Sequence, residues 1–105
     1  MPKYIIAYRG GKKPSTKEEG KIHIAKWQKW FANIGKNIVS PPAPLGKSKI
    51  VNSSGVFDAD KNAMNGYLIV KADDMDAALE IAKSDPFLEM EGAIIEVAQV
   101  MEMGK

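Results

Sequence analysis

The only histidine of the chain, His23, is the residue best suited to acid–base chemistry. An imidazole titrates near neutral pH, and a general base also needs an orienting carboxylate and a cleft. Two aspartates are candidates for that carboxylate, Asp85 and Asp58. We expect His23 and Asp85 to form a catalytic pair across the groove between two helices. The alternative is a structural histidine at the edge of the core, hydrogen-bonded to backbone or water.

The aromatic residues indicate a pocket for a flat, apolar ligand. Trp27 lies one helical turn after the histidine, and Tyr4, Tyr8 and Trp30 are further candidates for its wall. We predict that Tyr8, Trp27 and Asp58 bind the ligand. The alternative is that the aromatic residues at this spacing belong to the hydrophobic core.

No metal or cofactor site is predicted. One histidine and no cysteine leave only carboxylates to complete a metal site. Asp73, Asp74 and Asp76 cluster closely, but they stand at the start of a predicted helix, where acidic groups favour the helix dipole. The basic, glycine-containing segment 9–14 lacks the spacing of a phosphate-binding loop, and we interpret it as a solvated loop.

Length and composition limit the function further. The 105 residues have the size of a single domain, residues 1–105. Fifteen basic and 13 acidic residues give a net charge of +2, which is too balanced to predict a nucleic-acid partner. The longest apolar run, Tyr4 to Tyr8, is far too short to span a membrane. The absence of cysteine fits a cytoplasmic protein, which is the location we expect.

The segment from Thr16 to Gly35 predicts a long amphipathic helix. Thr16 and Glu19 have the spacing of a capping box at its start. Apolar residues recur at steps of three and four, which predicts one face packed on the core, with Trp27 as a large core side chain. The predicted face comprises Gly20, Ile24, Trp27, Phe31 and Ile34.

A second helix is predicted to begin after Asp73 or Asp74 and to end near Ser84. Asp85-Pro86 stops it, because proline removes a backbone donor and restricts the residue before it. Residues 87–90 are expected to form one extra turn. The predicted inward face of this helix comprises Met75, Ala78, Leu79 and Ala82.

The remaining segments predict strands at 3–8, 66–71 and 92–101, with an extended pair within 37–52. Pro41, Pro42 and Pro44 exclude regular central pairing and favour an edge or a bend. Segments 53–55 and 58–65 are predicted to be loops. The order is therefore β-α-β-β-α-β, which predicts an α+β, ferredoxin-like fold.

Three of the predicted strands carry apolar residues on both faces. Two helices cover only one face of a four-stranded sheet, so something else must cover the other face. A second copy of the chain is the simplest candidate, and we therefore expect a homodimer through that sheet face.

The order of these segments resembles the YCII-related domain family, which includes the Asp-Gly-Pro-Phe motif proteins. The similarity rests first on the opening strand 3–8 and on the helix that carries His23 and Trp27. It rests further on segment 65–78, where a strand that begins with Gly-Tyr is followed by aspartates that cap a helix. Asp85-Pro86-Phe87 and the strand 92–97 also fit the family pattern. The resemblance implies protomers that pair through their sheets into a dimeric α/β barrel. It also implies that a helix histidine near an aspartate has a catalytic role.

The chain departs from the family pattern at one loop. Longer members carry Asp-Gly-Pro-Phe where this chain has Asp58-Ala59-Asp60-Lys61, and only Asp58 corresponds. Two function classes follow. The first is a small-molecule enzyme that uses His23 as general acid and base in a pocket between helix and sheet. The alternative is a non-catalytic dimeric module that binds a small ligand or a protein. Polar groups around His23 in an open pocket would favour the enzyme, and a closed, dry core would favour the module.

Overall fold

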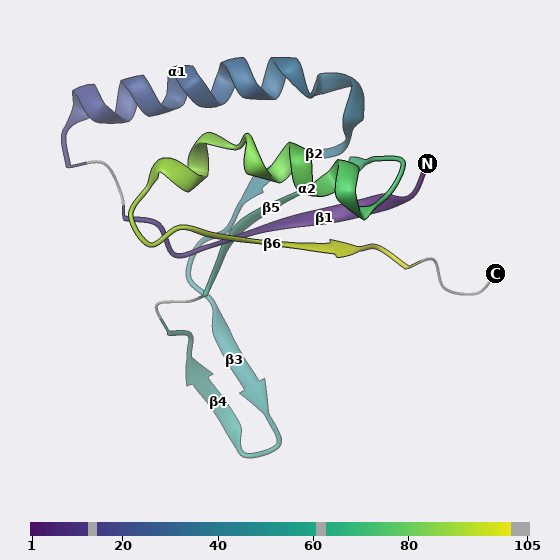
Figure 1. The fold of residues 1–105 in the computed structure, drawn as a ribbon. Coiled ribbons are helices and arrows are strands. Elements are labelled where there is room, and N and C mark those ends of the chain that lie inside the picture. The colour runs from purple at the N-terminus through teal and green to yellow at the C-terminus, as the bar shows by residue number, and fades with distance from the viewer. Residues whose placement is uncertain (13–14, 61–62, 102–105) are drawn as a thin grey trace.

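The computed structural model describes residues 1–12, 15–60 and 63–101, which form an α+β fold of two layers (Figure 1). An antiparallel sheet has the strand order β2-β5-β1-β6, and the helices lie on one face of it. This arrangement confirms the predicted ferredoxin-like fold. The strands of this sheet are β1 (Lys3–Arg9), β2 (Ile38–Pro44), β5 (Met64–Lys71) and β6 (Ile94–Gln99).

The helices begin and end where local sequence signals place them. The long helix α1 (Lys17–Asn33) starts at Thr16, whose side chain accepts a hydrogen bond from the Glu19 amide, as the capping box predicts. The second helix, α2 (Met75–Lys83), is capped by Asp74, which accepts from the amide of Ala77. Two short 3₁₀ turns complete the helical layer, η1 (Gly35–Asn37) and η2 (Pro86–Glu89).

The core lies between the sheet and the helices. Side chains alternate along the strands, so every second residue of β1 and β5 faces the helical layer and is buried. The largest fully buried side chains are Ile6, Leu68 and Val70. From α2 the buried residues are Ala78 and Ala82, whereas Met75 and Leu79, also predicted to face inward, are partly exposed.

The face of α1 that enters the core agrees with the predicted one in part: Ile34 is buried and Trp27 and Phe31 pack against the core, but Trp30 was not predicted to belong to it. Trp30 is the buried tryptophan, and its indole Nε1 donates a hydrogen bond to Ser84 Oγ at 2.8 Å, next to the end of α2. Trp27 is half-buried, and Ile24 is 56% exposed. The buried face of α1 is therefore rotated around the helix axis toward Trp30, because α1 packs against the segment that follows α2 as well as on the sheet.

The prolines of β2 lie where a proline is tolerated in a sheet. β2 is an edge strand, and its pairing with β5 is irregular near Ser40 and again before Ala43. Edge strands and irregular pairings are the places where the missing amide donor of proline does least harm. The predicted edge is thus confirmed.

A β-hairpin that the sequence did not predict is inserted between β2 and β5. Its strands are β3 (Lys49–Asn52) and β4 (Gly55–Asp58), which form a separate two-stranded sheet. We call this hairpin the arm. β3 lies within the segment predicted to be extended, and the turn at 53–54 lies within the predicted loop 53–55, but β4 was not predicted. Of the predicted loop 58–65, residues 61–62 lie outside the described part of the chain.

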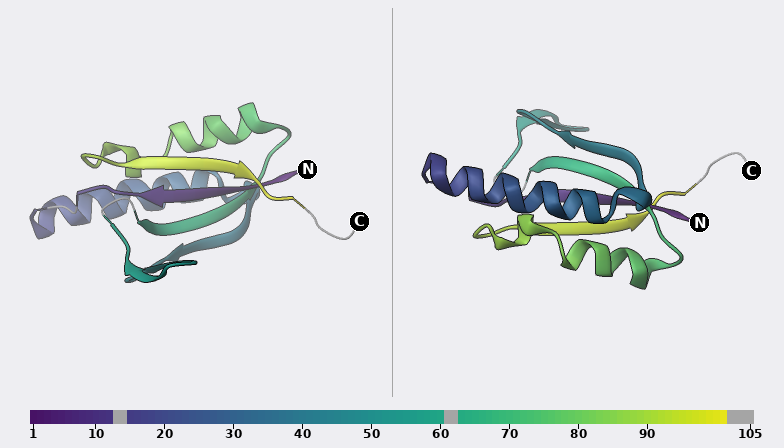
Figure 2. Two further views of the ribbon diagram at one scale, coloured as in Figure 1. Left: turned by 90° about the horizontal axis from the view of Figure 1, so that it is seen from below. Right: turned by 90° about the horizontal axis from the view of Figure 1, so that it is seen from above.

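Among the described residues, no helix or second sheet layer covers the sheet face opposite α1 and α2 (Figure 2). We call it the free face. Strand alternation places on it the apolar side chains of Ile5, Ala7, Tyr67, Ile69, Ile94 and Ala98. Within the described residues, no helix is long and apolar enough to cross a membrane.

Candidate functional site

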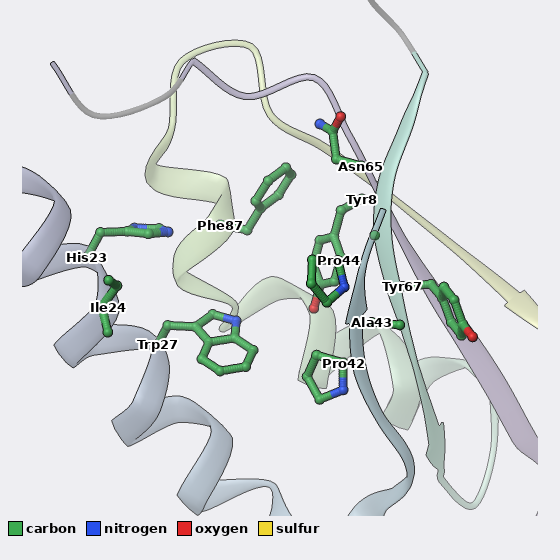
Figure 3. A pocket seen from close by; sticks show the side chains of 11 residues that line it. Tyr8, His23, Ile24, Trp27, Pro42, Ala43, Pro44, Asn65, Tyr67 and Phe87 are labelled. Atoms are coloured by element: carbon green, nitrogen blue, oxygen red, sulfur yellow. The ribbon is translucent and has the colours of Figure 1, made fainter. Parts of the chain in front are cut away.

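A pocket of about 370 Å³ opens between α1 and the part of the sheet formed by β2 and β5 (Figure 3). It lies on the helical side of the sheet, and its walls are mostly apolar. Helix α1 supplies His23, Ile24 and Trp27. The other walls come from β1, β2, β5 and η2, with Tyr8, Pro42, Pro44, Asn65 and Phe87.

The cap of α1 fixes which side chains reach the pocket. The Thr16 hydroxyl accepts from the Glu19 amide at 3.0 Å, and the Glu19 carboxylate accepts from the amide and hydroxyl of Ser15. This exchange sets the start of the helix, and hence the direction of every later side chain. His23 and Trp27 are one turn apart, so both point to the same side, toward the sheet.

The opposite wall depends on a close approach of two strands. A Cβ on Gly66 of β5 would lie 3.0 Å from the carbonyl oxygen of Ala43 in β2, so a larger residue would have to push the two strands apart. Pro42 and Pro44 flank this contact and present their rings to the pocket. Tyr67 also borders the pocket, but its ring points away toward the free face (Figure 3).

The imidazole of His23 lies between two environments. On one side is the apolar pocket with Trp27 and Phe87. On the other is a charged hollow, to which Lys12, Lys26 and Glu89 contribute. Within the described part of the chain His23 makes no hydrogen bond, so its nitrogens are available to a bound molecule or to water.

A buried hydrogen bond connects Tyr8 with Asp85, 77 positions apart. The Tyr8 hydroxyl donates to Asp85 Oδ2 at 2.6 Å, and the Phe87 amide donates to Oδ1 at 2.9 Å. Asp85 is 2% exposed. The rings of Tyr8 and Phe87 meet edge to face, with centroids 4.9 Å apart. The carboxylate therefore holds in place two aromatic rings that line the pocket.

Burial is the main influence on the ionisation of both groups. It raises the pKa of Asp85, while the hydrogen bonds from Tyr8 and from the Phe87 amide, and the nearby charge of His23, act to lower it. The pKa of Tyr8 is raised by burial, and further by the charge of Asp85 and by the hydrogen bond to it. A proton is therefore hard to remove from the Tyr8 hydroxyl.

Glycine also shapes the rim near Phe87. Gly11 has a positive φ of 84°, and a Cβ there would lie 3.1 Å from the Phe87 ring. Asn65 at the same rim donates a side-chain hydrogen bond to the carbonyl oxygen of Gly10. The loop after β1 is thus joined to the pocket wall.

The structure brings together three of the predicted site residues: His23, Tyr8 and Trp27 all line the pocket. Asp85 lies behind Tyr8, and among the described contacts it has no hydrogen bond or ion pair with His23. Asp58 is elsewhere, because it stands in the arm, where its exposed carboxylate pairs with Lys49. In the described chain no three histidine, cysteine or acidic side chains gather as a metal site would require.

Several pocket residues were missed by reasoning from the sequence alone. Asn65 and Phe87 reach the pocket only through the pairing of β5 with β1 and the turn after Asp85. Pro42 and Pro44 were interpreted as edge residues, without a role in binding. The Asp85-Pro86-Phe87 segment was the only available signal for the Phe87 wall.

Comparison with known proteins identifies the family. A profile of the YCII-related domain matches residues 5–104, nearly the whole chain. The chain belongs to the YCII-related family. A search of curated proteins found no match to this YCII-related chain.

Two solved structures share the fold of this YCII-related protein. One is 5-chloro-2-hydroxyhydroquinone dehydrochlorinase from Burkholderia phenoliruptrix AC1100, in complex with 2,5-dihydroxybenzoquinone. It is 19% identical, with a TM-score of 0.50 over 89% of this chain and 90% of that chain. The other is At3g17210 from Arabidopsis thaliana, 9% identical, with a TM-score of 0.50 over 100% of both chains. At these identities the similarity establishes the fold.

Proposed function

We propose that this protein is an enzyme that acts on a small, flat ring compound carrying hydroxyl or carbonyl groups, with His23 as general acid and base. One observation carries the proposal. The only imidazole of the chain points into an apolar pocket of about 370 Å³ and has no hydrogen-bond partner in the described chain. A histidine with a purely structural role would be expected to form hydrogen bonds from its ring nitrogens to other groups of the protein.

The lining of the pocket supports a ring-shaped substrate. Trp27 and Phe87 offer aromatic surfaces, and Pro42 and Pro44 offer flat aliphatic ones. Such walls bind a planar molecule by burying its faces, while a few polar groups fix its orientation. His23 and Asn65 are the polar side chains of this kind among the lining residues.

The chemistry suited to this geometry is proton transfer. Neutral His23 takes a proton from a hydroxyl group, or from carbon next to a carbonyl, and returns it at another position of the ring. The charged hollow on the other side of the imidazole gives it contact with solvent for proton exchange. Asp85 acts as a positioning residue in this proposal, since it holds Tyr8 and Phe87.

The choice of ring is supported by one of the structures with the same fold. The dehydrochlorinase from Burkholderia phenoliruptrix was crystallised with 2,5-dihydroxybenzoquinone, a planar six-membered ring that carries hydroxyl and carbonyl groups. A compound of that size fits within the volume of the pocket. We therefore use it as the probe of both binding and proton transfer.

Binding is tested by NMR, which benefits from the single histidine and two tryptophans of the chain. Addition of 2,5-dihydroxybenzoquinone is expected to shift the signals of the His23 imidazole and the Trp27 indole. The Trp30 indole, buried and bonded to Ser84, should move much less. Unchanged His23 and Trp27 signals at millimolar probe would contradict the proposed pocket chemistry.

Catalysis is tested by deuterium exchange of the ring hydrogens of the same compound in D₂O. The deuterated imidazolium of His23 delivers a deuteron to the ring carbon next to an ionised hydroxyl group, and the neutral imidazole that results acts as the base for that carbon. Loss of the original hydrogen from that carbon then restores the ring with deuterium in place. The wild type should accelerate this exchange, His23→Gln should not, and Lys21→Gln, a change on the exposed side of α1, should match the wild type. Binding without accelerated exchange would favour the non-catalytic alternative and overturn the enzyme proposal.

We also propose that the chain forms a homodimer in the cytoplasm through the free face. The support is the apolar side chains that strand alternation places on that face, where no helix covers them. A stable dimer needs a buried area above about 1,000 Å² in total, and the arrangement would be the dimeric α/β barrel. Light scattering after size exclusion tests it, and a monomer at micromolar concentration would refute it.

A further inference from the structure

The arm is a hairpin whose apolar side chains are about half exposed or more among the described residues. In its register Ile50 pairs with Phe57 on one face, and Val51 pairs with Val56 on the other. These side chains are 47%, 48%, 73% and 64% exposed, respectively. The arm is thus apolar on both of its faces.

Local forces alone do not account for an ordered arm. An isolated two-stranded hairpin is marginally stable at best in water. The ion pair between Lys49 and Asp58 is exposed, so it contributes little, and the turn adds one hydrogen bond from the Ser54 amide to Asn52 Oδ1. A second surface that buries the apolar pairs would supply the missing stabilisation.

The direction of the arm indicates where that surface lies. The arm leaves the sheet beside β2 and points away from the helices (Figure 1), and Figure 2 shows it at the β2 edge of the sheet. It therefore projects on the same side as the free face. One partner that covers the free face also meets the arm.

The length of the arm determines how far it reaches past such a partner. Each strand has four residues, which span about 13 Å at roughly 3.3 Å per residue. Two sheets packed face to face lie about 10 Å apart. An arm longer than this spacing extends beyond the partner's sheet and lies along its edge.

We infer that the arm grips a second copy of this chain along the edge of its sheet, an inference that rests on the proposed homodimer through the free face. A second copy presents the same two uncovered surfaces, so a two-fold axis lets each arm clasp the other protomer. A single isologous contact then buries both the free face and the apolar pairs of the arm. No unrelated partner is needed to account for either surface.

Cross-linking from the tip of the arm tests this directly. The chain has no cysteine, so Val51→Cys gives a single thiol, which is labelled with a benzophenone maleimide. Irradiation of mixed ¹⁴N- and ¹⁵N-labelled protein should give covalent dimers with cross-isotope peptides from β2 or β6. Lys21→Cys, labelled in the same way on the exposed side of α1, should give none. Cross-links only within one chain, or equal dimer yields from both sites, would overturn the inference.

The dimer dissociation constant gives an independent test. The double substitution Val51→Ser and Phe57→Ser removes apolar side chains that are exposed in the single chain, so the protomer should keep its fold by circular dichroism. The dimer dissociation constant, measured by analytical ultracentrifugation, should increase at least about tenfold. Lys47→Ser, an exposed change before the arm, should leave it unchanged.

The outcomes separate the two proposals. A wild type that is monomeric refutes the homodimer and the clasp together. A dimeric wild type whose dissociation is unaffected by the double substitution refutes the clasp and leaves the free-face dimer standing. The deuterium exchange at His23 is measured separately and does not depend on either result.

Discussion

Replacing Trp30 by alanine should cost about 3–5 kcal/mol of unfolding free energy, the usual range for removing a buried tryptophan or phenylalanine. Trp30 is 5% exposed, and its indole donates to Ser84 Oγ at 2.8 Å. The substitution therefore removes both apolar packing and a hydrogen bond between α1 and the end of α2. In urea, with a slope near the middle of the usual range, the midpoint should fall by about 2 M.

The matched comparison is Trp27→Ala, on the same helix and with the same atoms removed. Trp27 is half-buried at the wall of an open pocket, so its loss should cost only about 1–2 kcal/mol. Lys29→Ala, an exposed change nearby, should stay within about 0.5 kcal/mol. Unfolding is followed by far-ultraviolet circular dichroism, because tryptophan fluorescence changes with the substitutions themselves. A larger cost for Trp27→Ala than for Trp30→Ala would show that the face of α1 has been assigned wrongly.

Three further predictions concern the buried pair and the rim. Because the pKa of Asp85 is raised, its protonated form contributes stability that is fully present below the ordinary carboxyl pKa. This contribution is lost as the pH rises through the folded pKa of Asp85. In urea melts at a series of pH values, Asp85→Asn should therefore reduce the fall in stability over that pH range. The raised pKa of Tyr8 means that stability falls once the pH exceeds the ordinary tyrosine pKa, and Tyr8→Phe should reduce this alkaline loss in melts above about pH 10. Gly11→Ala should cost at least about 1 kcal/mol, because it combines a positive φ with a Cβ 3.1 Å from Phe87; a neutral effect in thermal melts would contradict the geometry at the rim.

Local signals were sufficient to predict the helices and the fold class. Thr16 and Asp74 are caps that act within three residues, and Asp85-Pro86 ends α2 by removing a donor. Such signals need no knowledge of the rest of the chain. The short continuous apolar runs of β1 and β5 likewise predict strands, whatever their partners.

The face of α1 and the pairs in the site depend on tertiary contacts. Trp27 and Trp30 are close on the helical wheel, and the contact of Trp30 with Ser84, 54 positions away, decides which of them is buried. The bond between Tyr8 and Asp85 spans 77 positions and exists only because α2 ends above β1. No local pattern in the sequence contains this information.

The arm was missed for a different reason. Its strands have four residues each, too few to show a period, and its turn, Ser53-Ser54, lacks the asparagine–glycine signal of tight hairpins. Asp58 was placed at the start of a predicted loop and considered as a carboxylate partner of His23 and as a ligand-binding residue. The arm instead carries Asp58 to an exposed position beside Lys49.

The prolines of β2 also limit how this protein aggregates. Three of its seven residues, Pro41, Pro42 and Pro44, have no amide hydrogen to offer. An exposed sheet edge normally acts as a template on which strands of other molecules add, and this is a common start of amyloid-like growth. With these donors missing, the β2 edge is a poor template for such growth. Replacing these prolines would restore hydrogen-bond donors to an exposed edge, and we would expect the protein to become more prone to fibril formation during folding and storage.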